Sequence, residues 1–237
     1  NDTALLTFKD FESAVWVSLA TSGPEVWTRD TTGVTSGTWR IIADISGFHT
    51  FVGSAYGDQF IGSADADTYV AFTTSQQTAS GVAYGTYVDM FDGMGGSDTV
   101  NFSGIEYRVV ADLTARGTNV WTTETQLEDS ATRLGLAKVA NVENFVGSTH
   151  YATHLTMAQG AGSFTGGSAN DTLVVKQGAG AGVLTFNGNG GSTLGPKGGD
   201  LADFSSFTHA LWIDLGEAVE VKTRGTSNEL TATGDYT

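Results

Sequence analysis

The chain contains 237 residues, of which 32 are glycine, two are proline and none is cysteine. Its length allows a sizeable core, while disulfides and thiolate metal sites are excluded. Eleven lysine and arginine residues stand against 26 aspartate and glutamate residues, and the net charge of −15 repels phosphate backbones and anionic headgroups, which excludes nucleic acids and membrane surfaces as partners. Hydrophobic residues make up 40% of the chain, too many for a disordered glycine-rich linker, and no apolar run is long enough for membrane insertion.

An internal repeat organises the chain. Residues 8–54 align without a gap with residues 102–148, at an offset of 94 and with 16 identities in 47 positions. A third, truncated copy begins at Phe204. Self-similarity of this kind predicts repeated structural units. The three predicted units span residues 1–92, 93–194 and 195–237.

Predicted strands recur in each unit. In the segments 15–19, 109–113 and 211–215, apolar residues follow the period-two pattern of a strand. The repeat places Trp27 and Trp121 in equivalent positions, as it does Leu19 and Leu113. The best candidate for a helix lies within residues 127–145. β-branched and aromatic residues, glycine turns and the long repeat predict an all-β, solenoid-like body.

Glycine-rich nonapeptides carry an aspartate at the sixth place. Those that begin at Gly53 and Gly62 are consecutive, and further copies begin at Gly93, Gly166 and Gly195. Small residues permit turns that are closed to bulkier side chains, and one carboxylate per turn suits a hard, oxygen-preferring cation. The five candidate metal ligands are Asp58, Asp67, Asp98, Asp171 and Asp200. The eighth places carry Phe60, Tyr69, Val100, Leu173 and Ala202.

These nonapeptides resemble the G-G-x-G-x-D-x-U-x repeats of the RTX, or haemolysin-type, calcium-binding family. The resemblance implies that the turns hold Ca²⁺ and that the x-U-x strands build a parallel β-roll, here with long loop insertions. The segments 98–104, 109–113 and 142–148 are also similar to a unit of long bacterial surface proteins. Family sites form between turns 18 residues apart, a spacing that no uninterrupted run provides here. For each aspartate the alternative is a plain turn closed by an Asx hydrogen bond.

No catalytic motif emerges from the sequence. His150 and His154 have the i, i+4 spacing of a zinc helix, but no glutamate follows the first histidine. Asp65 and Asp67 could form a glycosidase dyad in principle, but no recurring lysine or arginine accompanies them. We therefore predict that this chain is not an enzyme.

The leading hypothesis is a non-catalytic, calcium-binding structural segment of a secreted bacterial surface protein, such as a surface layer, filament or adhesin scaffold. It would lie outside the cell or on its surface and would self-associate into a homomeric assembly, because the ends of a solenoid expose unpaired strand edges. Two alternatives stay open. One is the C-terminal secretion and folding module of a calcium-dependent extracellular enzyme. The other is a carbohydrate-binding adhesin module, in which the recurring tryptophans would stack on a polysaccharide.

Overall fold

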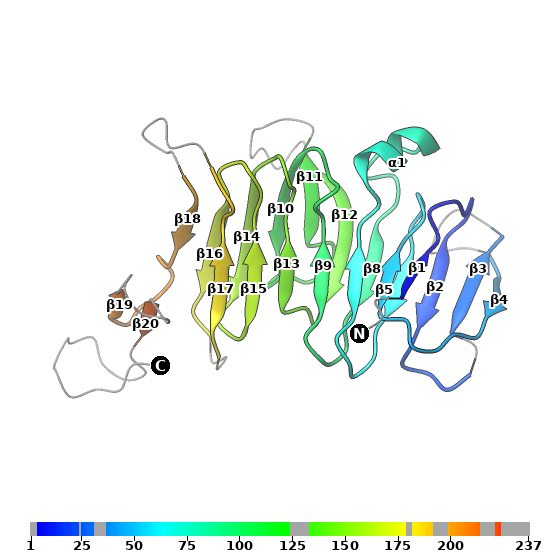
Figure 1. Ribbon diagram of the computed structural model, residues 1–237, viewed down its shortest axis with the longest axis horizontal. Helices are drawn as coiled ribbons and strands as arrows, with labels where there is room; N and C mark the ends of the chain where they lie inside the picture. Colours follow the sequence, from blue (N-terminus) through cyan, green and yellow to red (C-terminus); the bar gives the residue numbers. More distant parts are fainter. Residues whose placement is uncertain are drawn as a thin grey trace.

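The computed structural model describes residues 4–23, 25–30, 37–123, 133–178, 182–191, 199–213 and 221–223. These residues form twenty strands and one helix (Figure 1). The predicted all-β class is confirmed. In the described parts of the chain, no helix has the length and apolar character needed to cross a membrane.

The first sheet has seven strands, and every neighbouring pair in it is parallel. Parallel strands cannot be joined by tight hairpins, so the chain must leave the sheet between successive strands. In spatial order the strands are β1 (Leu5–Thr7), β5 (Thr50–Val52), β7 (Thr68–Val70), β9 (Thr99–Asn101), β13 (Asn144–Val146), β15 (Gly162–Thr165) and β17 (Leu184–Asn187).

The second sheet has eleven strands and combines parallel pairs with two antiparallel excursions, β2–β3–β4 and β10–β11–β12. A short antiparallel pair, β19 (Leu211–Ile213) and β20 (Val221–Thr223), forms a third sheet. In spatial order the eleven strands are β18 (Leu201–Asp203), β16 (Thr172–Lys176), β14 (Thr153–Ala158), β10 (Arg108–Asp112), β11 (Val120–Thr123), β12 (Arg133–Ala140), β8 (Asp89–Asp92), β6 (Gln59–Ile61), β2 (Val15–Ser18), β3 (Val26–Arg29) and β4 (Trp39–Ala43).

The core lies between the two large sheets, because successive segments of the chain alternate between them. The eighth residues of the first four nonapeptides are at most 1% exposed, whereas Ala202 is exposed. Aromatic rings contact one another across the core: Phe51 of the first sheet lies 5.7 Å from Phe60 of the second, and Phe60 lies 5.4 Å from Tyr69. Burying these rings removes a large apolar area from water and stabilises the two-sheet arrangement.

The strand registers of the first two copies follow the offset found in the sequence. The pairing of β2 with β3 and that of β10 with β11 are related by the offset of 94, and both third strands follow a register shift at the same place. Trp27 and Trp121 therefore occupy equivalent strands, as predicted. Leu19 and Leu113 each donate a main-chain hydrogen bond to the next parallel strand. Most of the third unit lies outside the described residues.

The helix prediction was wrong. Within residues 127–145, the described part forms β12 and the start of β13, because β11 and β8 pair with both edges of β12. The helix is instead α1 (Thr74–Ser80), in the connection between β7 and β8. A capping box formed by Thr73 and Gln76 begins it, and Gly81 ends it at φ 74°. Only Thr74 and Gln77 of α1 are buried, so no apolar periodicity marked it.

Candidate site at the aspartate turns

The five predicted aspartates share one structural position, the residue directly before a strand. The turns direct most of these carboxylates inward: Asp58, Asp67 and Asp98 are fully buried and Asp171 is 1% exposed, while Asp200 is partly exposed. Burying a carboxylate is unfavourable unless hydrogen bonds or a cation compensate it. The partners of each carboxylate therefore show what the position does.

Each of three carboxylates closes its own turn. Asp58, Asp67 and Asp171 accept hydrogen bonds from the main-chain N–H four residues earlier, at 2.5, 2.6 and 2.8 Å. The carboxylate lies so close to the first residue of the turn that a Cβ at Gly53 or Gly166 would approach it to 2.6 or 2.2 Å. The glycine that opens the nonapeptide is thus explained by the aspartate that closes it.

Asp58 and Asp171, together with Asp98 and Asp200, also link neighbouring segments along the sheets. Asp58 accepts a hydrogen bond from Val15 N–H at 2.7 Å, and Asp98 accepts one from Asp67 N–H at 2.7 Å. Further along the chain, Asp171 accepts from Thr153 N–H at 2.6 Å and Asp200 accepts from Asp171 N–H at 2.9 Å. The aspartates therefore act as hydrogen-bonded links between neighbouring turns, which we call the carboxylate ladder.

Three ladder members were missed by the sequence analysis. Asp89 accepts from Asp58 N–H and Glu143 accepts from Asp98 N–H, both at 2.9 Å, while His49 Nδ1 lies 2.8 Å from Asp67 Oδ1. Each stands two residues before a core phenylalanine, and none has a glycine five residues before it, where the nonapeptides begin. The polar residue two places before a buried aromatic was the available signal.

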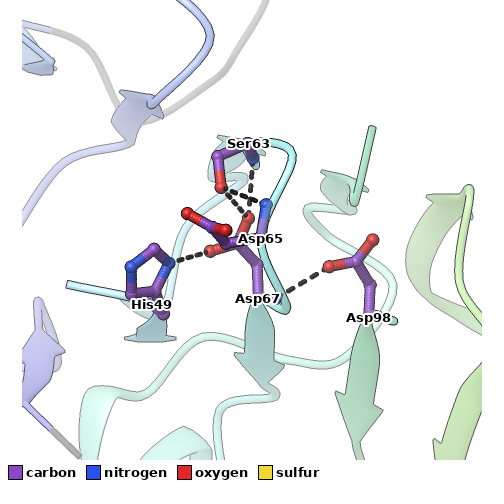
Figure 2. Close-up of polar contacts among 5 residues, drawn as sticks. All are labelled: His49, Ser63, Asp65, Asp67 and Asp98. Atoms are coloured by element: carbon purple, nitrogen blue, oxygen red, sulfur yellow. Dashed lines mark hydrogen bonds and ion pairs between the residues drawn. The ribbon is translucent and has the colours of Figure 1, made fainter. Parts of the chain in front are cut away.

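Figure 2 shows the ladder around Asp67. Its carboxylate lies against the His49 ring, and its main-chain N–H donates a hydrogen bond to the Asp98 carboxylate. The turns 62–67 and 93–98 stack directly: Gly95 N–H donates to the carbonyl of Ser63 at 3.0 Å. A Cβ at Gly96, where φ is +114°, would lie 2.4 Å from the carbonyl oxygen of Asp65. Stacked turns therefore occur without the 18-residue spacing, because α1 and its flanking residues form an insertion between them.

The carboxylates differ in how well they suit calcium, which takes six to eight oxygen ligands. Both oxygens of Asp58 and of Asp171 already accept main-chain N–H groups. In contrast, Asp98 Oδ2 is buried and has no hydrogen-bond partner among the described residues. The described residues contain no group of three or more acidic or histidine side chains arranged for a metal. Asp98 therefore differs from Asp58 and Asp171 in having a buried oxygen without a partner among the described residues.

Burial raises the pKa of several ladder carboxylates. The pKa of Asp58 is well above its usual value because of burial and the nearby charge of Asp89. Burial raises the pKa of Asp89 to about 7 and that of Asp171 to about 6, against the lowering effect of their hydrogen bonds. The pKa of Asp98 is raised for the same reason. Asp89 also accepts a hydrogen bond from the Tyr69 hydroxyl, whose pKa burial raises too.

Two cavities lie among the described residues. The cavity beside Tyr69 and Asp89 measures about 30 Å³, which is enough for about one water molecule. A groove of about 300 Å³ over the turns around Gly147 and Gly166 has no ionisable side chain in its lining. His154 lies in β14 and His150 in the turn before it, so the two do not share the face of a zinc helix.

The tryptophans of the first unit pack against one another. Trp16 and Trp27 are stacked with ring centroids 4.6 Å apart, and Trp39 lies 5.7 Å from Trp16. The guanidinium of Arg29 lies 4.2 Å from the centre of the Trp39 ring, a cation–π contact. This cluster stabilises the β2–β3–β4 excursion, and each of the three rings is partly exposed.

Comparisons of the chain with models of protein families, with curated proteins and with solved structures found no match. The functional argument therefore starts from the geometry of the two sheets and the carboxylate ladder.

Proposed function

We propose that this chain is a non-catalytic structural segment of a secreted bacterial surface protein, built as a parallel β-roll with insertions. The observation that carries the proposal is the carboxylate ladder, which binds neighbouring turns together through main-chain groups along both units. In these repeats the buried carboxylates connect neighbouring turns. Such connections suit an extended structural protein, because the stability of stacked repeats comes from contacts between neighbours.

The β-roll interpretation rests on the path of the chain. Between β5 and β10 the strands alternate from one sheet to the other at every step. In the first sheet β7 and β9 each lie parallel beside the strand before, and in the second sheet β8 lies parallel beside β6, whereas β11 and β12 separate β10 from β8. The apolar eighth residues of the first four nonapeptides face the space between the sheets. The insertions, namely α1 and the antiparallel excursions, interrupt this path without changing the order of the parallel strands.

We further propose that calcium is bound at Asp98, between the turns 62–67 and 93–98, and not at all five predicted aspartates. The free buried oxygen of Asp98 would be a ligand, together with carbonyl oxygens of the stacked turns. A bound Ca²⁺ would offset the negative charge that burial crowds together here. Asp58 and Asp171 would act through hydrogen bonds alone.

Two other functions compete with this one. Calcium would also stabilise the secretion and folding module of an extracellular enzyme. A catalytic domain in the same polypeptide would distinguish that function from a structural one. A carbohydrate-binding module would use the partly exposed Trp16, Trp27 and Trp39 rings. Their mutual stacking favours a packing role, since it covers ring faces that a sugar would need.

Thermal unfolding in 10 mM CaCl₂ and in excess chelator tests the calcium proposal, with 10 mM MgCl₂ as the control for charge screening. With a dissociation constant near 1 mM, binding to the folded state adds about 1.4 kcal/mol, or roughly 3–6 °C in Tm for a chain of this size. Asp98→Asn should abolish the calcium-specific increment, while the matched variant Asp58→Asn should keep it. Identical melting curves in calcium and magnesium would contradict the proposal.

A further inference from the structure

A small cavity lies beside the insertion that contains α1, which stands beyond the end of β8 (Figure 1). Residues of the turn 53–58, of α1 and its flanking segments, and of β7, β8 and β12 line it. Its volume is about 30 Å³, so it accepts a group of about the size of one water molecule. The chemistry of its lining therefore decides which small group it can hold.

Aromatic side chains form a large part of this lining. The rings of Tyr56 and Tyr87 lie 5.5 Å apart with their planes inclined by 59°, and those of Tyr69 and Phe102 lie 6.5 Å apart at 72°. The face of an aromatic ring is electron-rich and attracts a positive charge. Burial raises the pKa of the Tyr69 and Tyr84 hydroxyls, the latter to about 12, so these two phenols are neutral at neutral pH. Among the described residues, the aromatic lining consists of Tyr56, Tyr69, Phe72, Tyr84, Tyr87 and Phe102.

Asp89 is the one carboxylate among the described residues that line the cavity, and no lysine, arginine or histidine stands beside it in that lining. Its Oδ1 accepts a hydrogen bond from Asp58 N–H at 2.9 Å, and its Oδ2 accepts one from the Tyr69 hydroxyl. The two oxygens of an ionised carboxylate together offer about four lone-pair sites. Asp89 can therefore accept further hydrogen bonds from a donor placed in the cavity.

A second carboxylate adds to the negative charge at this place. Asp58 accepts hydrogen bonds from Val15 N–H at 2.7 Å and from Ser54 N–H at 2.5 Å, and the charge of Asp89 contributes to its raised pKa. Two buried carboxylates repel each other, and burying such charge without a positive partner is unfavourable. A cation in contact with Asp89 would reduce both effects.

We propose that this cavity binds an ammonium group, as the ammonium ion or as the head of a small primary amine, held by Asp89 and the tyrosine rings. Ammonium is close to water in size, and some of its N–H groups can donate to the carboxylate while the others face aromatic rings. Potassium has a similar size but exchanges its hydration shell for a set of oxygen ligands, which a mainly aromatic lining does not supply. The site is separate from Asp98, because Asp89 begins β8 whereas the turn 93–98 follows the other end of that strand.

Thermal unfolding of the 237-residue chain at pH 8 in excess chelator tests this proposal, because calcium is then excluded and the pH lies above the pKa of Asp89. The chlorides of ammonium, methylammonium, potassium and tetramethylammonium are compared at an ionic strength of about 0.1 M, and tetramethylammonium, which is too large for the cavity, is the reference. We expect ammonium to raise Tm by roughly 2–4 °C over the reference, for a dissociation constant of about 20 mM. An equal rise in methylammonium would assign the head of an amine, and no rise would assign the ammonium ion alone. Equal melting temperatures in ammonium and the reference, or an equal rise in potassium, would overturn the proposal.

Matched variants separate this site from general effects of the salts. Asp89→Asn removes the negative charge and keeps an acceptor for Asp58 N–H. It should lose the rise in ammonium, whereas the exposed control Asp10→Asn should keep it. Tyr56→Leu should weaken binding about two- to fivefold, whereas Tyr151→Leu, whose ring lies outside the lining, should leave it unchanged. An Asp89→Asn chain that keeps the full rise would overturn the proposal.

Amide chemical shifts measure binding directly. The Asp58 N–H donates to Asp89 and should shift saturably with ammonium, whereas the Asp67 N–H, which donates to Asp98, should not. Calcium should have the opposite effect on the two amides, so a failed ammonium site and a failed calcium site are distinguishable. The absence of a saturable shift of the Asp58 amide in ammonium would overturn the proposal.

Discussion

The buried pair Asp58 and Asp89 predicts that this protein becomes less stable as the pH rises from about 4 to about 7. In the unfolded chain Asp89 has the ordinary pKa of 3.8, whereas in the folded protein burial raises it to about 7. Between these values folding takes up a proton. The stabilisation is thus complete below pH 4, is lost as the pH approaches 7, and changes little above that.

The size of the effect follows from the pKa difference. Each pKa unit corresponds to about 1.4 kcal/mol, so the shift of Asp89 from 3.8 to about 7 corresponds to an upper limit of about 4 kcal/mol. Asp89→Asn removes the charge and keeps an acceptor oxygen for Asp58 N–H. It also removes the negative charge that helps to raise the pKa of Asp58. We therefore expect Asp89→Asn to be more stable than the wild type at pH 8, and the difference to vanish near pH 4.

Urea denaturation at pH 4, 5, 6, 7 and 8 measures this directly, with Asp10→Asn as the control that removes one exposed charge. The slope of the free energy of unfolding between pH 4 and 7 should be shallower in Asp89→Asn than in the control. A residual slope should remain, since the pKa of Asp171 is raised to about 6. Parallel pH profiles for the two variants would refute the argument that burial raises the pKa of Asp89.

Two further predictions concern the turns and the helix. Gly93→Ala should lower the free energy of unfolding by about 1–3 kcal/mol in urea denaturation. The added Cβ would lie 2.3 Å from the carbonyl oxygen of Asn141 and 2.4 Å from Asp98 Oδ2. The control Gly160→Ala, whose Cβ would have nothing within 4 Å, should be nearly neutral in the same assay. Thr73→Ala should lower stability by about 1 kcal/mol by removing the capping box of α1; an unchanged midpoint in thermal unfolding would show that α1 does not contribute to global stability.

The regular features of the fold were predictable from the sequence. Buried aromatic residues such as Phe60 and Tyr69 follow directly from the period of the nonapeptides, because a residue two places after each turn must face the core. The 94-residue offset also placed Trp27 and Trp121 correctly. In these places the local pattern and the tertiary structure agree, so the sequence alone was sufficient.

The unpredicted features depend on contacts between distant segments. The segment 133–140 has mixed periodicity, and its strand is stabilised by β11 and β8, which the local sequence does not reveal. Asp89 and Glu143 have no glycine five residues before them, where a nonapeptide would begin, so only the three-dimensional stack shows that they take part in the same ladder as Asp58 and Asp98. The stacking of turns 62–67 and 93–98 was likewise hidden, because the intervening insertion obscures their proximity.

Amide hydrogen exchange in excess chelator tests the central claim most directly. The N–H groups of Asp67 and Asp171 donate to the carboxylates of Asp98 and Asp200, so the ladder should protect them without any metal. We expect both amides to exchange as slowly as those of the core strands β7 and β16 beside them. Rapid exchange of these two amides in chelator, with protection appearing only in millimolar calcium, would contradict the ladder and would show that the metal holds the turns together.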